Sequence, residues 1–176
     1  MIEIGKMMRS AGLGFALTAT VLVGAQQLSA QAIGGHNSNA PVNFDADALD
    51  LLDNQNRLVL SGNVVIRQDR LTLRTARATV DYTNNGSLDI QRLTATGGVS
   101  VNRGGETVRG DVGIYDFNRR IITLSGNVKV ARGSDRLQGG RLVIDLNSGV
   151  SSVDSAPNAS SSEGGRVSGT FSVPGS

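Results

Sequence analysis

Leu60-Ser61-Gly62-Asn63-Val64 recurs as Leu124-Ser125-Gly126-Asn127-Val128, and a looser copy, Thr96-Gly97-Gly98-Val99, lies between the two. Each copy sits within a run in which apolar and polar residues alternate. Alternation with a period of two residues is typical of β-strands, because successive side chains of a strand point to opposite faces. Three such units with glycine at the centre predict a repetitive all-β structure and not a fold arranged around a single catalytic pocket.

The repeated glycines share the phase of the apolar residues around them. Gly62 falls on the same strand face as Leu60 and Val64, and Gly97 and Gly126 repeat this phase. Glycine weakens a strand interior unless it allows a sharp bend or the close approach of another group. We favour the bend, which predicts that strands turn a corner at each of these glycines.

Two changes of phase interrupt the partner strands. In the first of them Leu71 and Leu73 are odd-numbered, whereas the apolar residues from Ala76 to Tyr82 are even-numbered, which predicts a bulge or corner near Arg74 and Thr75. In a later partner strand, residues 108, 110, 112 and 114 hold the apolar phase before Tyr115 and Phe117 take odd positions, so a second irregularity is predicted just before Tyr115. No stretch of the exported chain has a helical period. We therefore predict an antiparallel all-β domain of about ten or more strands in two facing layers.

The beginning of the chain has the features of an export signal. Lys6 and Arg9 precede an uncharged, mostly apolar run that ends at Ala25, and Ala30-Gln31-Ala32 is a small-x-small cleavage pattern. We predict a signal peptide over residues 1–32 and an exported mature chain. The alternative that stays open is an uncleaved membrane anchor formed by the apolar run.

The remaining sequence divides into three parts. Residues 33–40 are polar and predict a flexible linker, whereas residues 41–146 contain all the alternating runs and predict one domain. Residues 147–176 are rich in serine, glycine and asparagine and predict a disordered tail. The first strand, around Val42, and the last, residues 142–146, carry little to guard their edges against pairing with another copy; alternatively, the tail covers the last edge.

Composition argues against catalysis and nucleic-acid binding. The chain has no cysteine and a single histidine, His36, which we interpret as a solvated linker residue. Asp45 and Asp47 share a strand face, but with Asp50 and Asp53 nearby they are more typical of a solvated acidic face than of a catalytic pair. The 17 basic and 15 acidic residues are nearly balanced, so no nucleic-acid partner is expected. We expect no enzyme, metal site or cofactor.

Several segments resemble the OstA-like family. The opening of its domain is similar to Phe44-Asp45-Ala46-Asp47 followed by residues 58–66, 71–73 and Val80-Asp81-Tyr82. Its second half is similar to residues 108–116, 122–128 and 139–142. The resemblance covers nearly all of the predicted domain, and the order and spacing of the pieces make it specific. It implies an open antiparallel β-jellyroll.

The resemblance also implies a function: a periplasmic lipopolysaccharide-transport protein whose apolar interior shields the acyl chains of lipid A. It implies head-to-tail self-association and assembly with inner-membrane LptC-like and outer-membrane LptD-like partners of the same fold. The candidate lipid-binding residues are Val42, Phe44, Leu60, Val64, Val99, Ile114, Tyr115, Phe117 and Leu124. Which face Tyr115 and Phe117 occupy stays open because of the nearby phase change. The alternatives are a membrane-anchored LptC-like relative or a β-rich structural or adhesive repeat protein.

Overall fold

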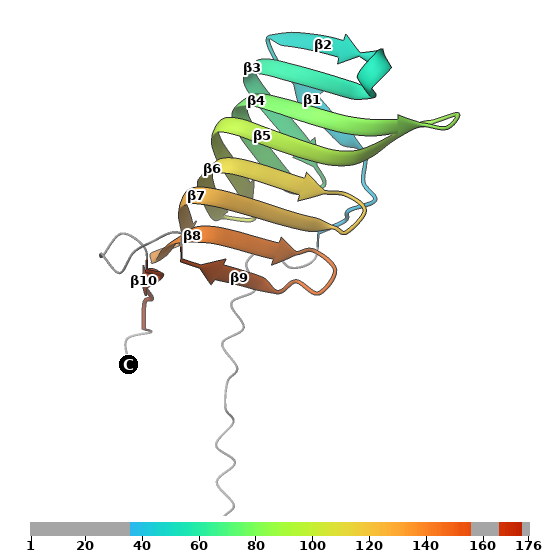
Figure 1. Ribbon diagram of the computed structural model, residues 1–176. Helices are drawn as coiled ribbons and strands as arrows, with labels where there is room; N and C mark the ends of the chain where they lie inside the picture. The colour runs from blue at the N-terminus through green and yellow to red at the C-terminus, as the bar shows by residue number, and fades with distance from the viewer. Residues whose placement is uncertain (1–35, 156–165, 174–176) are drawn as a thin grey trace, which may run out of the picture.

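The computed structural model describes residues 36–155 and 166–173. These residues form one antiparallel sheet of ten strands with a short 3-10 helix (Figure 1). The elements are β1 (Val42–Asp45), β2 (Ala48–Leu52), η1 (Asp53–Gln55), β3 (Arg57–Gln68), β4 (Leu71–Asn84), β5 (Leu88–Arg103), β6 (Glu106–Asp116), β7 (Ile121–Arg132), β8 (Asp135–Asp145), β9 (Ser151–Asp154) and β10 (Ser168–Thr170). Hydrogen-bonded neighbours follow the order β1-β3-β4-β5-β6-β7-β8-β10, while β2 also pairs with β3 and β9 with β8.

The long strands β3 to β8 bend near their middles, so that the sheet turns back on itself (Figure 1). At each bend the pairing register shifts, as between Ser61 and Val64 of β3. We call the two resulting layers the β1 layer and the β2 layer. The β1 layer contains β1, β10 and the adjoining halves of the long strands, and the β2 layer contains β2, β9 and the other halves. This arrangement confirms the predicted open antiparallel β-jellyroll.

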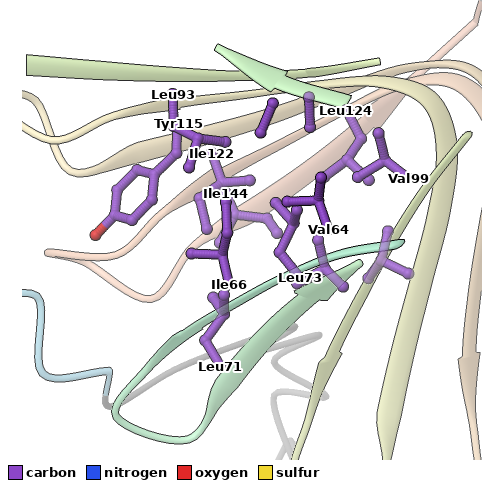
Figure 2. Packing of buried hydrophobic residues seen from close by; sticks show 14 of the residues in the cluster. Val64, Ile66, Leu71, Leu73, Leu93, Val99, Tyr115, Ile122, Leu124 and Ile144 are labelled. Atoms are coloured by element: carbon purple, nitrogen blue, oxygen red, sulfur yellow. The ribbon is translucent and has the colours of Figure 1, made fainter. Parts of the chain in front are cut away.

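The core lies between the two layers and is almost entirely aliphatic. The largest fully buried side chains are Leu60, Leu124, Leu142, Ile144, Val64, Val101, Val108 and Val128. Figure 2 shows side chains from several strands, among them Val64, Leu73 and Ile144, pointing toward one another. Alternation along each strand brings these residues together, because every second side chain points into the space between the layers.

The repeated glycines stand at the bends, as predicted, but they do not line the interior. Gly62 has a φ of 75°, and a Cβ added there would lie 2.8 Å from the Cβ of Asp47. Gly126 has a φ of 77°, and its added Cβ would lie 2.9 Å from the Cβ of Asp111. Bending and close approach, which the sequence left as alternatives, therefore occur together.

The first predicted phase change is confirmed, and the second lies earlier than expected. The register between β4 and β5 shifts between Thr75 and Arg77. The register between β6 and β7 shifts between Arg109 and Val112, and not immediately before Tyr115. The earlier shift moves Ile114 to the outer face, because Tyr115, next to it, pairs with the core residues Leu93 and Ile122.

The segments that flank the domain are partly ordered. His36 is buried, so its interpretation as a solvated linker residue is wrong, and residues 36–40 are held by hydrogen bonds instead of forming a free linker. The prediction of a disordered tail from residue 147 is wrong for β9 and β10, which pair with β8. They cover the edge of β8 that the sequence left unguarded. The predicted signal peptide, residues 1–32, lies outside the described residues.

Candidate functional site

The inner faces of the two layers form the candidate functional site. Most of the predicted lipid-binding residues lie there and are buried, namely Leu60, Val64, Val99, Tyr115 and Leu124, each at most 5% exposed. Val42 and Phe117 are partly buried against the same core. In the structure the middle of the interior is thus filled by the protein's own side chains.

One end of the interior exposes apolar side chains instead of burying them. Phe44 of β1 pairs with the core residue Ile66 and faces inward, yet it is 45% exposed. Leu49 and Leu51 of β2 pair with Leu60 and Leu58 and face inward from the opposite layer, with 46% and 51% exposure. We call Phe44, Leu49 and Leu51 the open apolar end. An exposed apolar surface that continues a buried core is typical of a ligand-binding or assembly surface.

Leu49 and Leu51 are functional candidates that the sequence analysis missed. The alternation Leu49-Asp50-Leu51 was the available signal, because the two leucines flank a polar residue as they do in a half-buried strand. The aspartates drew attention to an acidic face. Asp50 is indeed exposed, but the strand that carries it directs its leucines inward.

Aromatic side chains line the other margin of the interior. Tyr115 is 5% exposed and stacks on Phe117, with 3.9 Å between ring centroids and 23° between ring planes. Burial raises the pKa of Tyr115, while the nearby Ser38 side chain and Arg120 guanidinium act in the opposite direction. Tyr115 and Phe117 therefore belong to the interior side, whereas Ile114 is 38% exposed on the outer face.

The acidic residues near the N-terminal edge have separate structural partners. Asp45 forms an ion pair with Arg67, and Asp47 accepts a hydrogen bond of 2.8 Å from the side-chain amide of Asn63. The two carboxylates are exposed and are not arranged as a pair around a common reactant. This geometry agrees with the predicted solvated acidic face.

A separate hollow of about 690 Å³ lies at the bend of β3 to β6. Val64 and Val99 contribute to its lining, but so do the exposed Arg74 and Arg109 and the partly buried Ser100. Charged side chains on an open surface give an acyl chain little shelter from water. The inner faces of the layers are therefore the better candidate for an apolar ligand.

The fold and the site define a class: a bent, open antiparallel sheet whose apolar inner face reaches the surface at one end suits the carriage of an apolar ligand. Residues 43–150 match the family described as "LptA/(LptD N-terminal domain) LPS transport protein". The chain belongs to this family of lipopolysaccharide (LPS) transport proteins, and the matched residues run from β1 to the residue that precedes β9.

Two individual proteins extend the comparison. The chain is 28% identical over 131 residues to an uncharacterized protein of Rhizobium meliloti (strain 1021), a match that covers 70% of each chain. Its fold is similar to the crystal structure of LptH, the LptA-homologous periplasmic component of the LPS transport device of Pseudomonas aeruginosa. That match has a TM-score of 0.66 and 18% identity, and it covers 78% of this chain and 99% of LptH.

Proposed function

We propose that this protein is a periplasmic carrier that shields the acyl chains of lipid A between its two layers. The observation that carries the proposal is the open apolar end, where Phe44, Leu49 and Leu51 continue the buried interior to the surface. Membership of the LPS transport family supplies the ligand class. An acyl chain that leaves water for this surface gains roughly 0.8 kcal/mol per buried methylene group.

The proposed path begins at the open apolar end and continues along the inner faces. Leu60 lies directly across the strand pair from Leu49, and Ile66 lies across from Phe44. A chain bound at the end is therefore in line with the buried lining, which includes Val64, Val99 and Leu124. Because the centre is filled, deep binding requires the layers to separate.

Site-specific photo-crosslinking to LPS tests this proposal. A photoreactive amino acid at Phe44, Leu49 or Leu51 is expected to give LPS adducts, because these side chains face inward and are accessible. The same group at Ile114 is the matched control, since Ile114 is a similarly exposed apolar residue on the outer face. Equal labelling at Ile114 and at the inner positions, or no labelling at any inner position, would contradict the proposal.

We further propose that copies of the protein, with LptC-like and LptD-like partners, join head to tail through opposite ends of the sheet. In the described residues β1 and β2 pair with a strand on one side only, which leaves their outer backbone groups free at the N-terminal edge. At the other edge, β9 and β10 each pair with β8 among the described strands. Pairing between two different edges propagates along one direction without closing. Sedimentation velocity over a range of concentrations tests it, and a monomer at every concentration would argue against self-assembly.

Location in the periplasm is proposed from the predicted signal peptide and from the family. In the part of the chain that the structure describes, no helix is long and apolar enough to cross a membrane. N-terminal sequencing of the exported protein is expected to start near Ile33. Recovery of an intact Met1 with membrane association would favour the anchored, LptC-like alternative.

We propose a binding and transport role without catalysis or cofactor. Among the described residues, no group of three or more histidine, cysteine, aspartate or glutamate side chains is placed to hold a metal ion. The buried His36 is bonded to a glutamine and not to a nucleophile. The single proposed activity is therefore reversible binding of the lipid.

A further inference from the structure

The segment 36–40, which we call the strap, runs along the side of the molecule opposite the bends (Figure 1). The strand turns of both layers meet the gap between the layers on this side. The turn between β3 and β4, at Gln68 and Asp69, belongs to the β1 layer, and the turn between β6 and β7, at Arg120, belongs to the β2 layer. A segment that binds both turns ties the two layers together.

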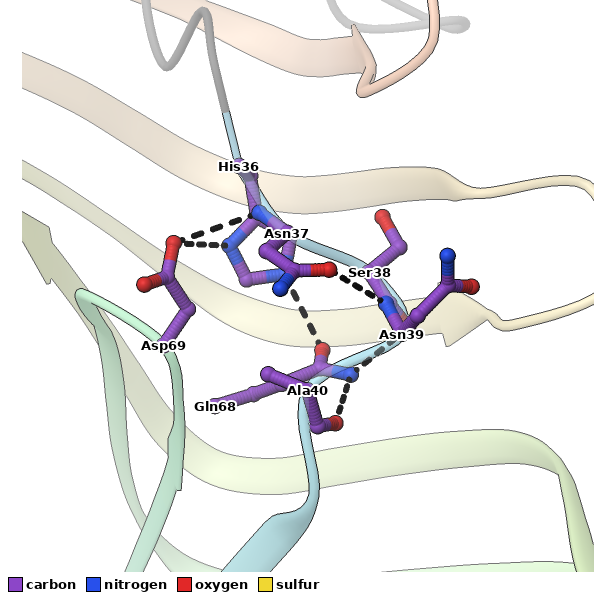
Figure 3. Close-up of polar contacts among 7 residues, drawn as sticks. All are labelled: His36, Asn37, Ser38, Asn39, Ala40, Gln68 and Asp69. Atoms are coloured by element: carbon purple, nitrogen blue, oxygen red, sulfur yellow. Dashed lines mark hydrogen bonds and ion pairs between the residues drawn. The ribbon is translucent and has the colours of Figure 1, made fainter.

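Gln68 is the anchor of the strap in the β1 layer (Figure 3). Its side-chain amide nitrogen donates to the backbone oxygens of Ser38 at 2.9 Å and Ala40 at 3.0 Å. These two bonds orient the amide so that its oxygen faces His36, whose Nε2 lies 3.0 Å away and acts as the donor. Gln68 is only 4% exposed, so these three bonds are sheltered from water.

Asp69 adds a second contact in the same layer. The backbone N–H of Asn37 donates to the Asp69 carboxylate at 3.2 Å, and this bond lowers the pKa of Asp69. The strap is also braced internally, because the backbone N–H groups of Asn39 and Ala40 both donate to Asn37 at 3.1 Å. The strap therefore has a defined conformation.

One hydrogen bond joins the strap to the β2 layer. The Arg120 guanidinium donates to the side-chain oxygen of Asn39 at 3.2 Å. Arg120 also opposes the rise that burial causes in the pKa of Tyr115, so the residue that binds the strap is electrostatically coupled to the buried tyrosine. The strap therefore connects the turn at Gln68 and Asp69 with the turn at Arg120, across the gap between the two layers.

We propose that the strap is a gate for lateral entry of acyl chains. While it is bound, it ties the turns of the two layers and keeps the interior closed, and when it is released the layers part on the side opposite the bends. This inference rests on the proposed carrier function. It names the element that controls access to the same site, and it accounts for a filled interior in a protein that must admit a lipid.

The layer separation can be measured directly, since the chain contains no cysteine of its own. Spin labels at Arg70→Cys and Arg119→Cys, on exposed turns of the β1 and β2 layers, report the distance across the gap. In the absence of ligand, the variants Gln68→Ala and Asn39→Ala are expected to increase the fraction of molecules in which the two layers, and therefore the two spin labels, are far apart. The expected increase is about tenfold for Gln68→Ala, which removes three bonds, and about threefold for Asn39→Ala, which removes one.

Asn102→Ala is the matched control variant. It removes a hydrogen bond of 2.9 Å from Asn102 to Thr107 at another turn of the β1 layer, away from the strap. The distribution of distances between the two spin labels in Asn102→Ala is expected to equal that of the labelled protein without a further substitution. If Gln68→Ala disturbs folding, Asn39→Ala still decides the question, because Asn39 is exposed. Unchanged distances in both strap variants would overturn the gate.

The association rate of LPS is the second measurement, and it separates the two proposals. Both strap variants are expected to bind LPS faster than Asn102→Ala does, by factors similar to those in the distance populations. If LPS binds with the same rate in all variants, the gate is wrong and the carrier function stands. If no variant binds LPS, the carrier function is wrong, while the label distances still show whether the strap holds the layers together.

Discussion

The bends at Gly62 and Gly126 are built from the same three residue types, glycine, asparagine and aspartate, whereas the bend at Gly97 is built differently. In the first two bends, the glycine lies close to an aspartate, Asp47 or Asp111. The asparagine that follows the glycine, Asn63 or Asn127, donates a 2.8 Å hydrogen bond to that aspartate. In the third, Gly97 and Gly98 both have positive φ, of 82° and 85°. We call the asparagine–aspartate hydrogen bond of the first two bends the clamp. The third bend forms without it, because two consecutive glycines accept the positive φ angles that a bend requires.

The difference between the bends follows from the backbone conformation that each bend requires. The second residue of each bend is left-handed, with φ of 46° at Asn63, 48° at Asn127 and 85° at Gly98. Asparagine tolerates this conformation better than other residues with a side chain, and glycine accepts it without strain. Ala76 stands where the other bends have aspartate, since a Cβ on Gly97 would lie 2.8 Å from the Ala76 Cβ. The middle bend therefore lacks the clamp.

The largest effect is expected from Gly126→Ala. The new Cβ would meet Asp111, and the residue would be forced into a left-handed conformation, for a combined cost of about 3 kcal/mol or more. Urea unfolding measures the loss. A loss below about 1 kcal/mol would mean that the bend relaxes easily and that the clamped bends are not rigid.

Asn127→Ala comes next, with an expected loss of about 2 kcal/mol in the free energy of unfolding. It removes the bond to Asp111 and puts alanine in a left-handed position. Asn127→Gly is the control, because glycine keeps the conformation and loses only the bond. If both variants lose the same stability, the conformational part of the explanation is wrong.

Gly98→Ala is expected to cost about 1 kcal/mol, less than either change at the clamped bend. A Cβ on Gly98 meets nothing within 4 Å, so only the left-handed conformation opposes the substitution. Thermal or urea unfolding of Gly98→Ala and Gly126→Ala under the same conditions ranks the two losses in the free energy of unfolding. A larger loss for Gly98→Ala than for Gly126→Ala would reverse the comparison.

The smallest effect is expected from transplanting the clamp. The double variant Ala76→Asp with Gly98→Asn places an acceptor and a donor where the other bends have them, and a gain of about 0.5 kcal/mol is expected from one exposed hydrogen bond. The two single variants are the controls, and a double-mutant cycle isolates the coupling. A coupling of zero would show that the third bend differs in backbone path as well as in side chains.

Sequence patterns predicted much of the fold because its strands are locally consistent. Alternation located β3 and β7, the phase change located the shift in β4, and the repeated glycines located the bends. The clamp itself was missed, although its spacing repeats: Asp47 and Asp111 each precede their asparagine by 16 residues. Two exposed aspartates look like a solvated face until the partner strand is known.

The candidate site was only partly predictable. Buried residues such as Leu60 and Leu124 follow from the two-residue period, because a strand next to a core must direct one face inward. The position of Ile114 was wrong because a bulge moves every later side chain to the other face, and the sequence placed this bulge too late. The open apolar end was missed for a different reason, since exposure at an edge depends on which strands lack a neighbour.

The sequence by itself determined an all-β chain with bends at its repeated glycines and an aliphatic face along each strand. These are local properties, set by side-chain alternation and by the conformations that glycine and asparagine accept. Only the tertiary structure decided that β9 and β10 cover one edge of the sheet and that residues 36–40 tie its two layers together. The two short strands add by backbone pairing from a serine- and glycine-rich segment, and residues 36–40 are held by single polar bonds to distant residues, so neither feature leaves a periodic trace in the sequence.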